Sequence, residues 1–269
     1  TVSSGFPAGP PGGKTGGVER PAPVFYELSA IPEFGAFLVA APWLATAPRG
    51  TGRRVLVLPG FTAGDVSTAP LRAALRALGH KPSPWGLGLN VGPDDETVRQ
   101  LLRLLDRLVQ QNGGPIDIVG WSLGGIMARL LALHHPDRVR QVISLGSPIH
   151  IVDPDANISD AVRRLSQLAG LQRNRRGHDL TVVPVPSTVI YSRGDGVVAA
   201  ASCIQPAGPT SENIEVRGAH VGLGHNPAVV WAVADRLAQR GTDWQPFEPP
   251  SMISWCYPGS ANAVGIAST

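Results

Sequence analysis

The sequence has few cysteines and few charged residues. Its 269 residues include only two cysteines, Cys203 and Cys256, without CxxC spacing and without other metal-binding side chains beside them. We therefore predict no metal site, and the sequence leaves open whether the two thiols pair or stay free. Lysine and arginine exceed aspartate and glutamate by 23 to 20, and no long basic run occurs. So small an excess of positive charge does not favour nucleic-acid binding.

Long hydrophobic runs are also absent. No apolar stretch reaches the roughly 20 residues that a membrane helix needs, so we expect no integral membrane association. Hydrophobic residues make up 43% and charged residues 16% of the chain, a balance that favours a folded core over disorder. The printed sequence opens at Thr1 without a secretory leader. This fits a cytoplasmic protein or a secreted one whose leader has been removed, and nothing in the sequence indicates the oligomeric state.

Glycine and proline are concentrated at the amino end. Residues 1–23 contain six glycines and five prolines, a composition that predicts a flexible arm. We assign residues 24–248 to a single domain. Residues 249–269 carry no charged side chain and are expected to form a C-terminal tail.

From residue 53 onward, short apolar runs alternate with segments of helical periodicity. The predicted strands cover 55–58, 115–119, 139–145, 188–191 and 214–216, the predicted helices cover 67–78, 98–109, 126–133 and 229–237, and 85–90 is a short strand or a loop. This alternation is typical of an α/β fold with a mostly parallel sheet and helices on both of its faces.

One long interval interrupts the pattern. Within 150–180, apolar spacing predicts a helix over 158–169, either a surface helix packed on the core or a small cap over an active site.

The segment 120–124 reads GWSLG and lies between a predicted strand and a predicted helix. A serine at such a sharp turn takes a strained backbone conformation that exposes its hydroxyl group. Bulkier residues two positions to either side would clash, which explains the glycines. The helix that follows directs its N-terminus at the reaction centre and favours negative charge there. We therefore predict that Ser122 is a nucleophile.

A serine nucleophile needs a histidine base, and the histidine needs an acid to hold it. Asp195 follows the strand 188–191 and His220 follows the strand 214–216, in the order serine, acid, histidine that accompanies such a turn. Both would lie with Ser122 at the carboxyl edge of the sheet. His225 is the alternative base, but it precedes Asn226 and Pro227 and is more typical of the start of a helix.

The negative charge that develops on the attacked carbonyl oxygen needs backbone N–H donors. Leu123 follows the nucleophile and would supply one, and Phe61, in the loop after the first strand, would supply the other. Apolar residues near the predicted site are candidates for substrate contact. These are Trp85, Trp121, Val197 and Val221.

Taken together, these segments resemble the α/β-hydrolase superfamily, and most closely its bacterial lipase and esterase branch. The matching stretches are LPGFTAGD at 58–65, WGLGLN at 85–90, the serine turn, LGSP at 145–148, SRGDGVV at 192–198, and GAHVGL at 218–223 followed by Asn226 and Pro227. They cover about residues 53–240. The resemblance implies the α/β-hydrolase fold, a Ser-Asp-His triad and ester hydrolysis, and it does not specify the acyl or alcohol group.

We therefore expect a serine carboxylic-ester hydrolase that works through an acyl-enzyme intermediate and needs no cofactor. Its substrate would be a small-molecule, lipid or polymer ester with an apolar acyl group, and a polyester would require an open groove. The same triad could pass the acyl group to another acceptor or cleave amides, so an acyltransferase and an amidase remain alternatives. A binding protein that has lost turnover is less favoured because the triad residues are all present.

Overall fold

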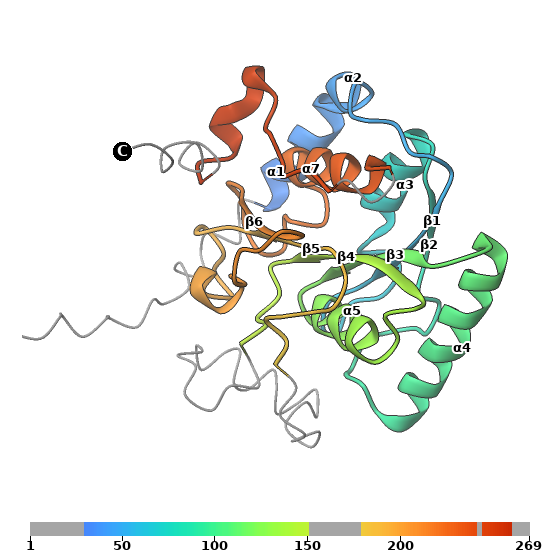
Figure 1. Ribbon diagram of the computed structural model, residues 1–269. Coiled ribbons are helices and arrows are strands. Elements are labelled where there is room, and N and C mark those ends of the chain that lie inside the picture. Colours follow the sequence, from blue (N-terminus) through green and yellow to red (C-terminus); the bar gives the residue numbers. More distant parts are fainter. Residues whose placement is uncertain (1–29, 151–178, 241–243, 260–269) are drawn as a thin grey trace, which may run out of the picture.

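The computed structural model describes residues 30–150, 179–240 and 244–259 (Figure 1). The predicted arm 1–23 and the predicted helix 158–169 lie outside these ranges, as does most of the predicted cap 150–180. The described parts form a central sheet with helices on both sides (Figure 1).

Within the described ranges, the sheet contains six strands in the order β2-β1-β3-β4-β5-β6. They are β1 (Arg54–Leu58), β2 (Lys81–Ser83), β3 (Ile116–Trp121), β4 (Val139–Leu145), β5 (Ser187–Tyr191) and β6 (Ser211–Glu215). Every pair of neighbours is parallel, which confirms the predicted fold class. Sequence analysis missed β2, which is short and contains Pro82. An edge strand tolerates proline because its free side needs no donor. The segment 85–90, predicted as a strand or a loop, is a loop.

Helices cover both faces of the sheet. Those of the described ranges are α1 (Ala30–Val39), α2 (Ala41–Leu44), α3 (Ala69–Ala77), α4 (Asp95–Asn112), α5 (Leu123–His134) and α7 (Pro227–Ala238). Helices α4 and α5 lie on one face, and α3 and α7 on the other (Figure 1). Strand residues alternate between these layers, as the two-residue period of a strand requires. Leu56 and Leu58 of β1 pack toward α4 and α5, while Val55 and Val57 pack toward α3 and α7.

Residues at both ends of the described chain extend the layer around α7. Trp43 of α2 stacks on Trp231 of α7, with ring centroids 4.7 Å apart. Tyr257 is buried, and its hydroxyl donates a hydrogen bond to the Ala228 carbonyl at 2.8 Å. The packed chain therefore continues beyond residue 248, where sequence analysis placed the end of the domain.

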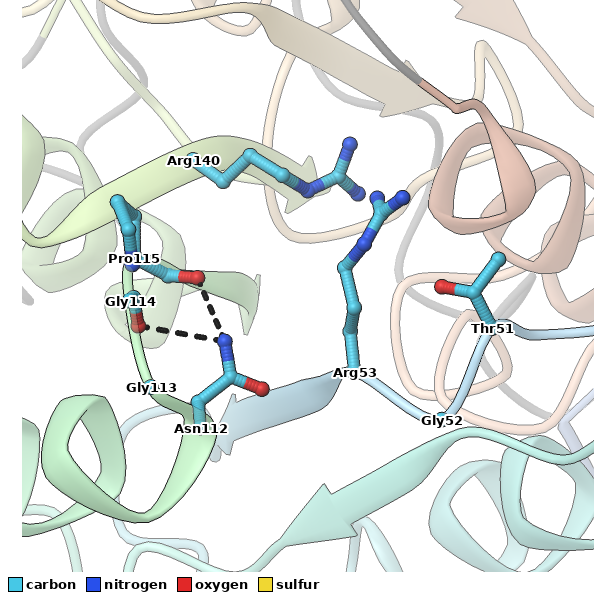
Figure 2. Close-up of a pocket in the computed structure, with 8 residues that line it drawn as sticks. All are labelled: Thr51, Gly52, Arg53, Asn112, Gly113, Gly114, Pro115 and Arg140. Atoms are coloured by element: carbon cyan, nitrogen blue, oxygen red, sulfur yellow. Dashed lines mark hydrogen bonds between the residues drawn. The ribbon is translucent and has the colours of Figure 1, made fainter.

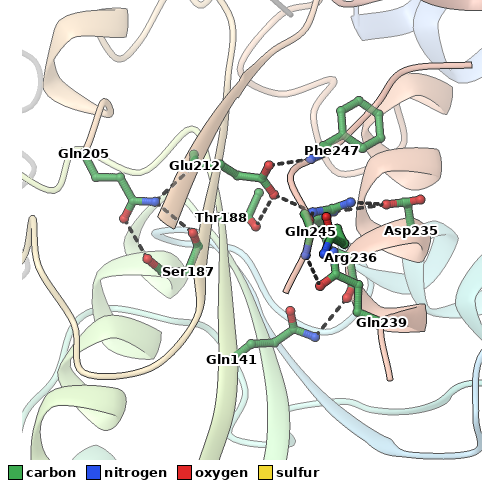
Figure 3. A network of polar contacts seen from close by, with 10 residues as sticks. All are labelled: Gln141, Ser187, Thr188, Gln205, Glu212, Asp235, Arg236, Gln239, Gln245 and Phe247. Atoms are coloured by element: carbon green, nitrogen blue, oxygen red, sulfur yellow. Dashed lines mark hydrogen bonds and ion pairs between the residues drawn. The ribbon is translucent and has the colours of Figure 1, made fainter. Parts of the chain in front are cut away.

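A buried polar network ties the segment after α7 to the sheet (Figure 3). The Arg236 guanidinium donates to one carboxylate oxygen of Glu212 at 3.0 Å, and the Phe247 N–H donates to the other at 2.7 Å. Glu212 thus links β6, α7 and the chain near Phe247. The charged side chains of Glu212 and Arg236 therefore hold these three segments of the fold together.

Two sequence questions have structural answers. Cys203 and Cys256 do not form a disulfide with each other, and Cys203 is buried. Among the helices of the described ranges, none combines the length and the apolar character that would be needed to cross a membrane.

Candidate active site

Ser122 lies between the end of β3 and the start of α5, with backbone angles φ 54° and ψ −119°. Within the described ranges, only Thr62 shares a positive φ among residues other than glycine. Such a conformation costs on the order of 1–3 kcal/mol and persists only where surrounding contacts impose it. The Ser122 N–H donates to the Leu145 carbonyl of the neighbouring strand at 2.8 Å. The sharp turn predicted from the sequence is therefore present.

The glycines of the turn allow backbone segments to approach closely. A Cβ atom on Gly120 would lie 2.3 Å from the Gly124 carbonyl oxygen, and one on Gly124 would lie 2.4 Å from the Leu58 carbonyl oxygen. Neither contact involves a flexible side chain that could move aside. The spacing of glycines around Ser122 thus follows from the packing of β3 and α5 against β1.

His220 and Asp195 form a buried pair. His220 Nδ1 lies 2.6 Å from Asp195 Oδ2. The other carboxylate oxygen of Asp195 accepts hydrogen bonds from the N–H groups of Val197 and Val198, at 2.8 and 2.6 Å. These bonds fix the orientation of the carboxylate, and the carboxylate in turn fixes the imidazole. The structure pairs His220 with Asp195, and His225 lies at the entrance to α7 instead.

Gly146 lies between Ser122 and the Asp195–His220 pair, at the carboxyl edge of the sheet. It follows β4, whose last residue, Leu145, accepts the Ser122 N–H. A Cβ atom on Gly146 would lie 3.2 Å from both Asp195 Oδ2 and His220 Nδ1.

The hydroxyl of Ser122 donates no hydrogen bond to any residue that the structure describes. Catalytic hydrogen bonds of this kind often tighten only when a substrate is bound.

The two predicted oxyanion donors lie beside the serine. A Cβ atom on Gly60 would lie 3.4 Å from the Cβ atom of Ser122, which brings the loop after β1 next to the turn. Leu123 begins α5, so its N–H is one of those that lack an acceptor within the helix. Within the described ranges, no atom accepts a hydrogen bond from the Phe61 or Leu123 N–H. The arrangement can stabilise negative charge on an oxygen near Ser122.

The predicted substrate contacts differ in their surroundings. Trp85 is only 2% exposed, packs in the core near α4, and donates its indole N–H to the Gly88 carbonyl at 2.9 Å. Trp85 therefore offers almost no surface area to a substrate. So large an apolar ring gains more free energy from burial in the core than from exposure at a binding site. Trp121 donates its indole N–H to the His220 carbonyl at 3.2 Å, and Val221, beside His220, is exposed.

Sequence analysis gave no role to two residues that shape the site. Gly146 lies within the matching stretch 145–148, and its lack of a side chain makes room for the Asp195–His220 pair. Asn90 likewise lies within a matching stretch, 85–90, and it is fully buried and bonded to the loop that contains Phe61. A buried asparagine in a glycine-rich loop is a weak sequence signal, because asparagine is common in exposed turns.

A separate cavity of about 380 Å³ lies at the opposite edge of the sheet, where β1 and β3 begin (Figure 2). The two arginine side chains that line this cavity donate hydrogen bonds to other groups of the protein. Arg53 donates to the Gln239 carbonyl at 3.0 Å, and Arg140 donates to Asp117 Oδ1 at 2.6 Å. A strand of the length of β1 places this cavity roughly 15 Å from the Ser122 edge. Across the described ranges, no three His, Cys, Asp or Glu side chains gather as a metal site would.

The comparisons with known proteins agree with this architecture. A family model described as the alpha/beta hydrolase fold matches residues 58–182. The structure resembles that of lipase B from Aspergillus fumigatus, with a TM-score of 0.53 and 16% sequence identity, over 72% of this chain and 55% of that one. The chain belongs to the α/β-hydrolase superfamily.

Two curated relatives of this α/β hydrolase match shorter stretches. A 2-hydroxymuconate semialdehyde hydrolase of Pseudomonas putida is 29% identical over 165 residues, which cover 56% of this chain and 58% of the relative. Lipase LipV of Mycobacterium tuberculosis is 40% identical over 77 residues, or 29% of this chain and 27% of the relative. The chain thus spans less than two thirds of the length of these relatives.

Proposed function

We propose that this α/β hydrolase is a serine carboxylic-ester hydrolase. Ser122 Oγ attacks the ester carbonyl carbon while the His220 ring accepts its proton. The N–H groups of Phe61 and Leu123 bind the resulting oxyanion. The protonated ring then gives its proton to the departing alcohol, which leaves the acyl group on Ser122. Asp195 holds the imidazole and stabilises its positive charge.

The second half of the reaction releases the acid. Water attacks the acyl-enzyme carbonyl and His220 accepts one of its protons. When the tetrahedral intermediate collapses, the proton returns to Ser122 Oγ, and the carboxylic acid leaves. The observation that carries the proposal is the 2.6 Å contact between His220 and Asp195, at the same sheet edge as the strained turn of Ser122.

Exposed apolar side chains near the site support an apolar acyl group. Val66, Leu89, Val91 and Val221 are 87%, 65%, 58% and 48% exposed. Along the chain, Leu89 and Val91 adjoin the buried Asn90, Val221 adjoins His220, and Val66 follows the loop of Phe61. We therefore place them at the border of the catalytic edge. Apolar surface gains about 25 cal/mol per Å² when it is removed from water, which favours lipid-like or polymeric esters. The name of the lipase relative points to the same chemistry.

The test is hydrolysis of p-nitrophenyl esters with acyl chains from two to sixteen carbons. The Ser122→Ala variant is expected to lose at least about a thousandfold in kcat/KM while keeping its fold. Ser144→Ala is the matched control, because Ser144 is a buried serine on the adjacent strand β4, and it should stay within about threefold of the unmodified protein.

The results separate the alternatives. More than a few per cent of activity in Ser122→Ala would remove Ser122 from the proposal. A folded protein that cleaves no ester, but releases p-nitroaniline from anilides, would be an amidase. Faster release of p-nitrophenol with added alcohol, together with formation of a new ester, would identify an acyltransferase.

A further inference from the structure

Asn90 is fully buried and bonds the loop after β1 on both sides of Phe61. Its side-chain amide donates to the Pro59 carbonyl at 2.8 Å. Its backbone carbonyl accepts the Thr62 N–H at 2.7 Å, and its backbone N–H donates to the Ala63 carbonyl at 2.9 Å. One residue thus makes three hydrogen bonds to a loop of five residues, with Phe61 at its centre.

These contacts determine which N–H groups of the loop remain available. The Thr62 N–H is taken by Asn90, and the Ala63 N–H donates to the Gly60 carbonyl at 3.2 Å. The Phe61 N–H has no acceptor in the described part of the chain. Thr62 itself has φ 57°, a conformation that is unfavourable for a β-branched residue and therefore needs contacts such as those of Asn90 to hold it.

We propose that Asn90 is a positioning residue that aims the Phe61 N–H at the oxyanion formed on the substrate. The proposal rests on the function proposed above. The side-chain bond to Pro59 orients the peptide groups that precede Phe61, and the backbone bonds hold the residues that follow it. A donor fixed before the reaction begins costs no reorganisation when charge develops, which is why fixed donors accelerate such reactions.

The structure allows this role to be separated from general support of the fold. Asp65 joins the same two loops independently, because its carboxylate accepts the N–H groups of Trp85 and Gly86 at 3.0 and 3.1 Å. Replacement of Asn90 by alanine also leaves its backbone bonds in place. The Asn90→Ala variant should therefore keep the loops together while the Phe61 N–H loses its fixed direction.

The experiment compares substrate turnover with the binding of an alkyl trifluoromethyl ketone, whose adduct with the serine carries an oxyanion. Asn90→Ala is expected to lower kcat about 10- to 100-fold, with KM within about threefold, since loss of one oxyanion donor lowers kcat about 100- to 1000-fold. Affinity for the ketone should fall by the same factor as kcat/KM. Asn90→Leu, which is close in size but lacks the N–H donor and adds no buried charge, should behave alike and covers the case in which the alanine variant does not fold.

The control is Asp94→Ala. Asp94 accepts the Thr97 N–H at 2.7 Å at the start of α4, so the variant loses a side-chain to backbone hydrogen bond that is remote from Phe61. It should lower the melting temperature but leave kcat and ketone affinity within about twofold of the unmodified protein. The inference is wrong if folded Asn90 variants match Asp94→Ala in kcat and ketone affinity. It is also wrong if turnover falls while ketone affinity stays unchanged. An unmodified protein without any esterase activity would instead contradict the proposed function.

Discussion

The two edges of the sheet both carry ionisable side chains, but they use them differently. At the edge where β1 and β3 begin, the guanidinium groups of Arg53 and Arg140 approach each other beside the cavity (Figure 2). Both donate to the backbone at the end of α7. At the edge where the strands end, Ser122 has a strained backbone and the Phe61 N–H has no acceptor in the described ranges. The polar groups of the first edge hold a helix, whereas the second edge includes a backbone N–H group without an acceptor in the described ranges.

The buried acids at the two edges illustrate the difference. Asp117, at the amino edge, is completely buried, and desolvation raises the pKa of its carboxyl group against the opposing effect of Arg140. One of its oxygens, Oδ2, has no hydrogen-bond partner among the residues that the structure describes. Asp195, at the carboxyl edge, is also buried but uses both oxygens, one for His220 and one for two backbone N–H groups. The fully bonded carboxylate of Asp195 holds the His220 imidazole in one orientation, whereas Asp117 mainly compensates the charge of an arginine.

The largest expected effect tests which histidine belongs to the catalytic edge. His220→Ala should lower kcat/KM for p-nitrophenyl esters at least about a thousandfold, because Ser122 loses its base. His225→Ala is the matched control and should change kcat/KM by less than about tenfold, as the Asp195–His220 pair stays intact. Steady-state kinetics on both variants decides the matter, and the reverse order of effects would move the base to His225.

The second prediction is that the amino edge supports stability and leaves catalysis unaffected. Arg140→Leu leaves the Asp117 carboxylate buried without its charged partner, so the free energy of unfolding should fall by about 3 kcal/mol. The value of kcat should remain within about twofold. Urea unfolding gives the first quantity and ester hydrolysis the second. Arg103→Leu, at an exposed pair with Glu96, is the control and should cost less than about 1 kcal/mol. A large loss of kcat in a folded Arg140→Leu protein would contradict the prediction that the amino edge supports stability alone.

The smallest effect concerns His80, a buried residue whose two ring nitrogens have no hydrogen-bond partner in the described part of the chain. Burial, together with the charges of Arg140 and Arg53, lowers the pKa of His80 to about 4 from 6.5. Between these values the unfolded chain binds more protons than the folded one, so stability decreases as the pH falls from about 6.5 to about 4. After allowance for solvent screening we expect this loss to be on the order of 1–2 kcal/mol.

His80→Phe keeps a ring in place and removes the titrating group. Urea unfolding at pH 7 and pH 4.5 should therefore show a smaller decrease in stability for this variant than for the unmodified protein. Other groups also titrate in this range, and their contribution is common to both proteins. Identical pH dependence in the two proteins would show that His80 does not titrate differently on folding.

Much of the fold could be predicted from local patterns. Continuous apolar runs such as 55–58 identify buried parallel strands, because both of their faces are covered, and this run lies within β1. The strand 139–145 was predicted with the bounds observed. The short edge strand β2 was missed because Lys81 and Pro82 give it no such pattern. Tyr257 lies in a segment without charge or periodicity, so its burial against α7 could not be foreseen from local sequence.

The sequence by itself determined the parallel α/β architecture and the serine turn, because apolar periodicity and the spacing of glycines are local properties of the chain. It also indicated His220 over His225, through the position of each relative to a strand and a helix. Only the tertiary structure decided that Gly146 makes room for the Asp195–His220 pair, that Trp85 belongs to the core, and that Asn90 holds the loop of Phe61. These facts depend on contacts between segments far apart along the chain, and such contacts exist only once the strands have paired.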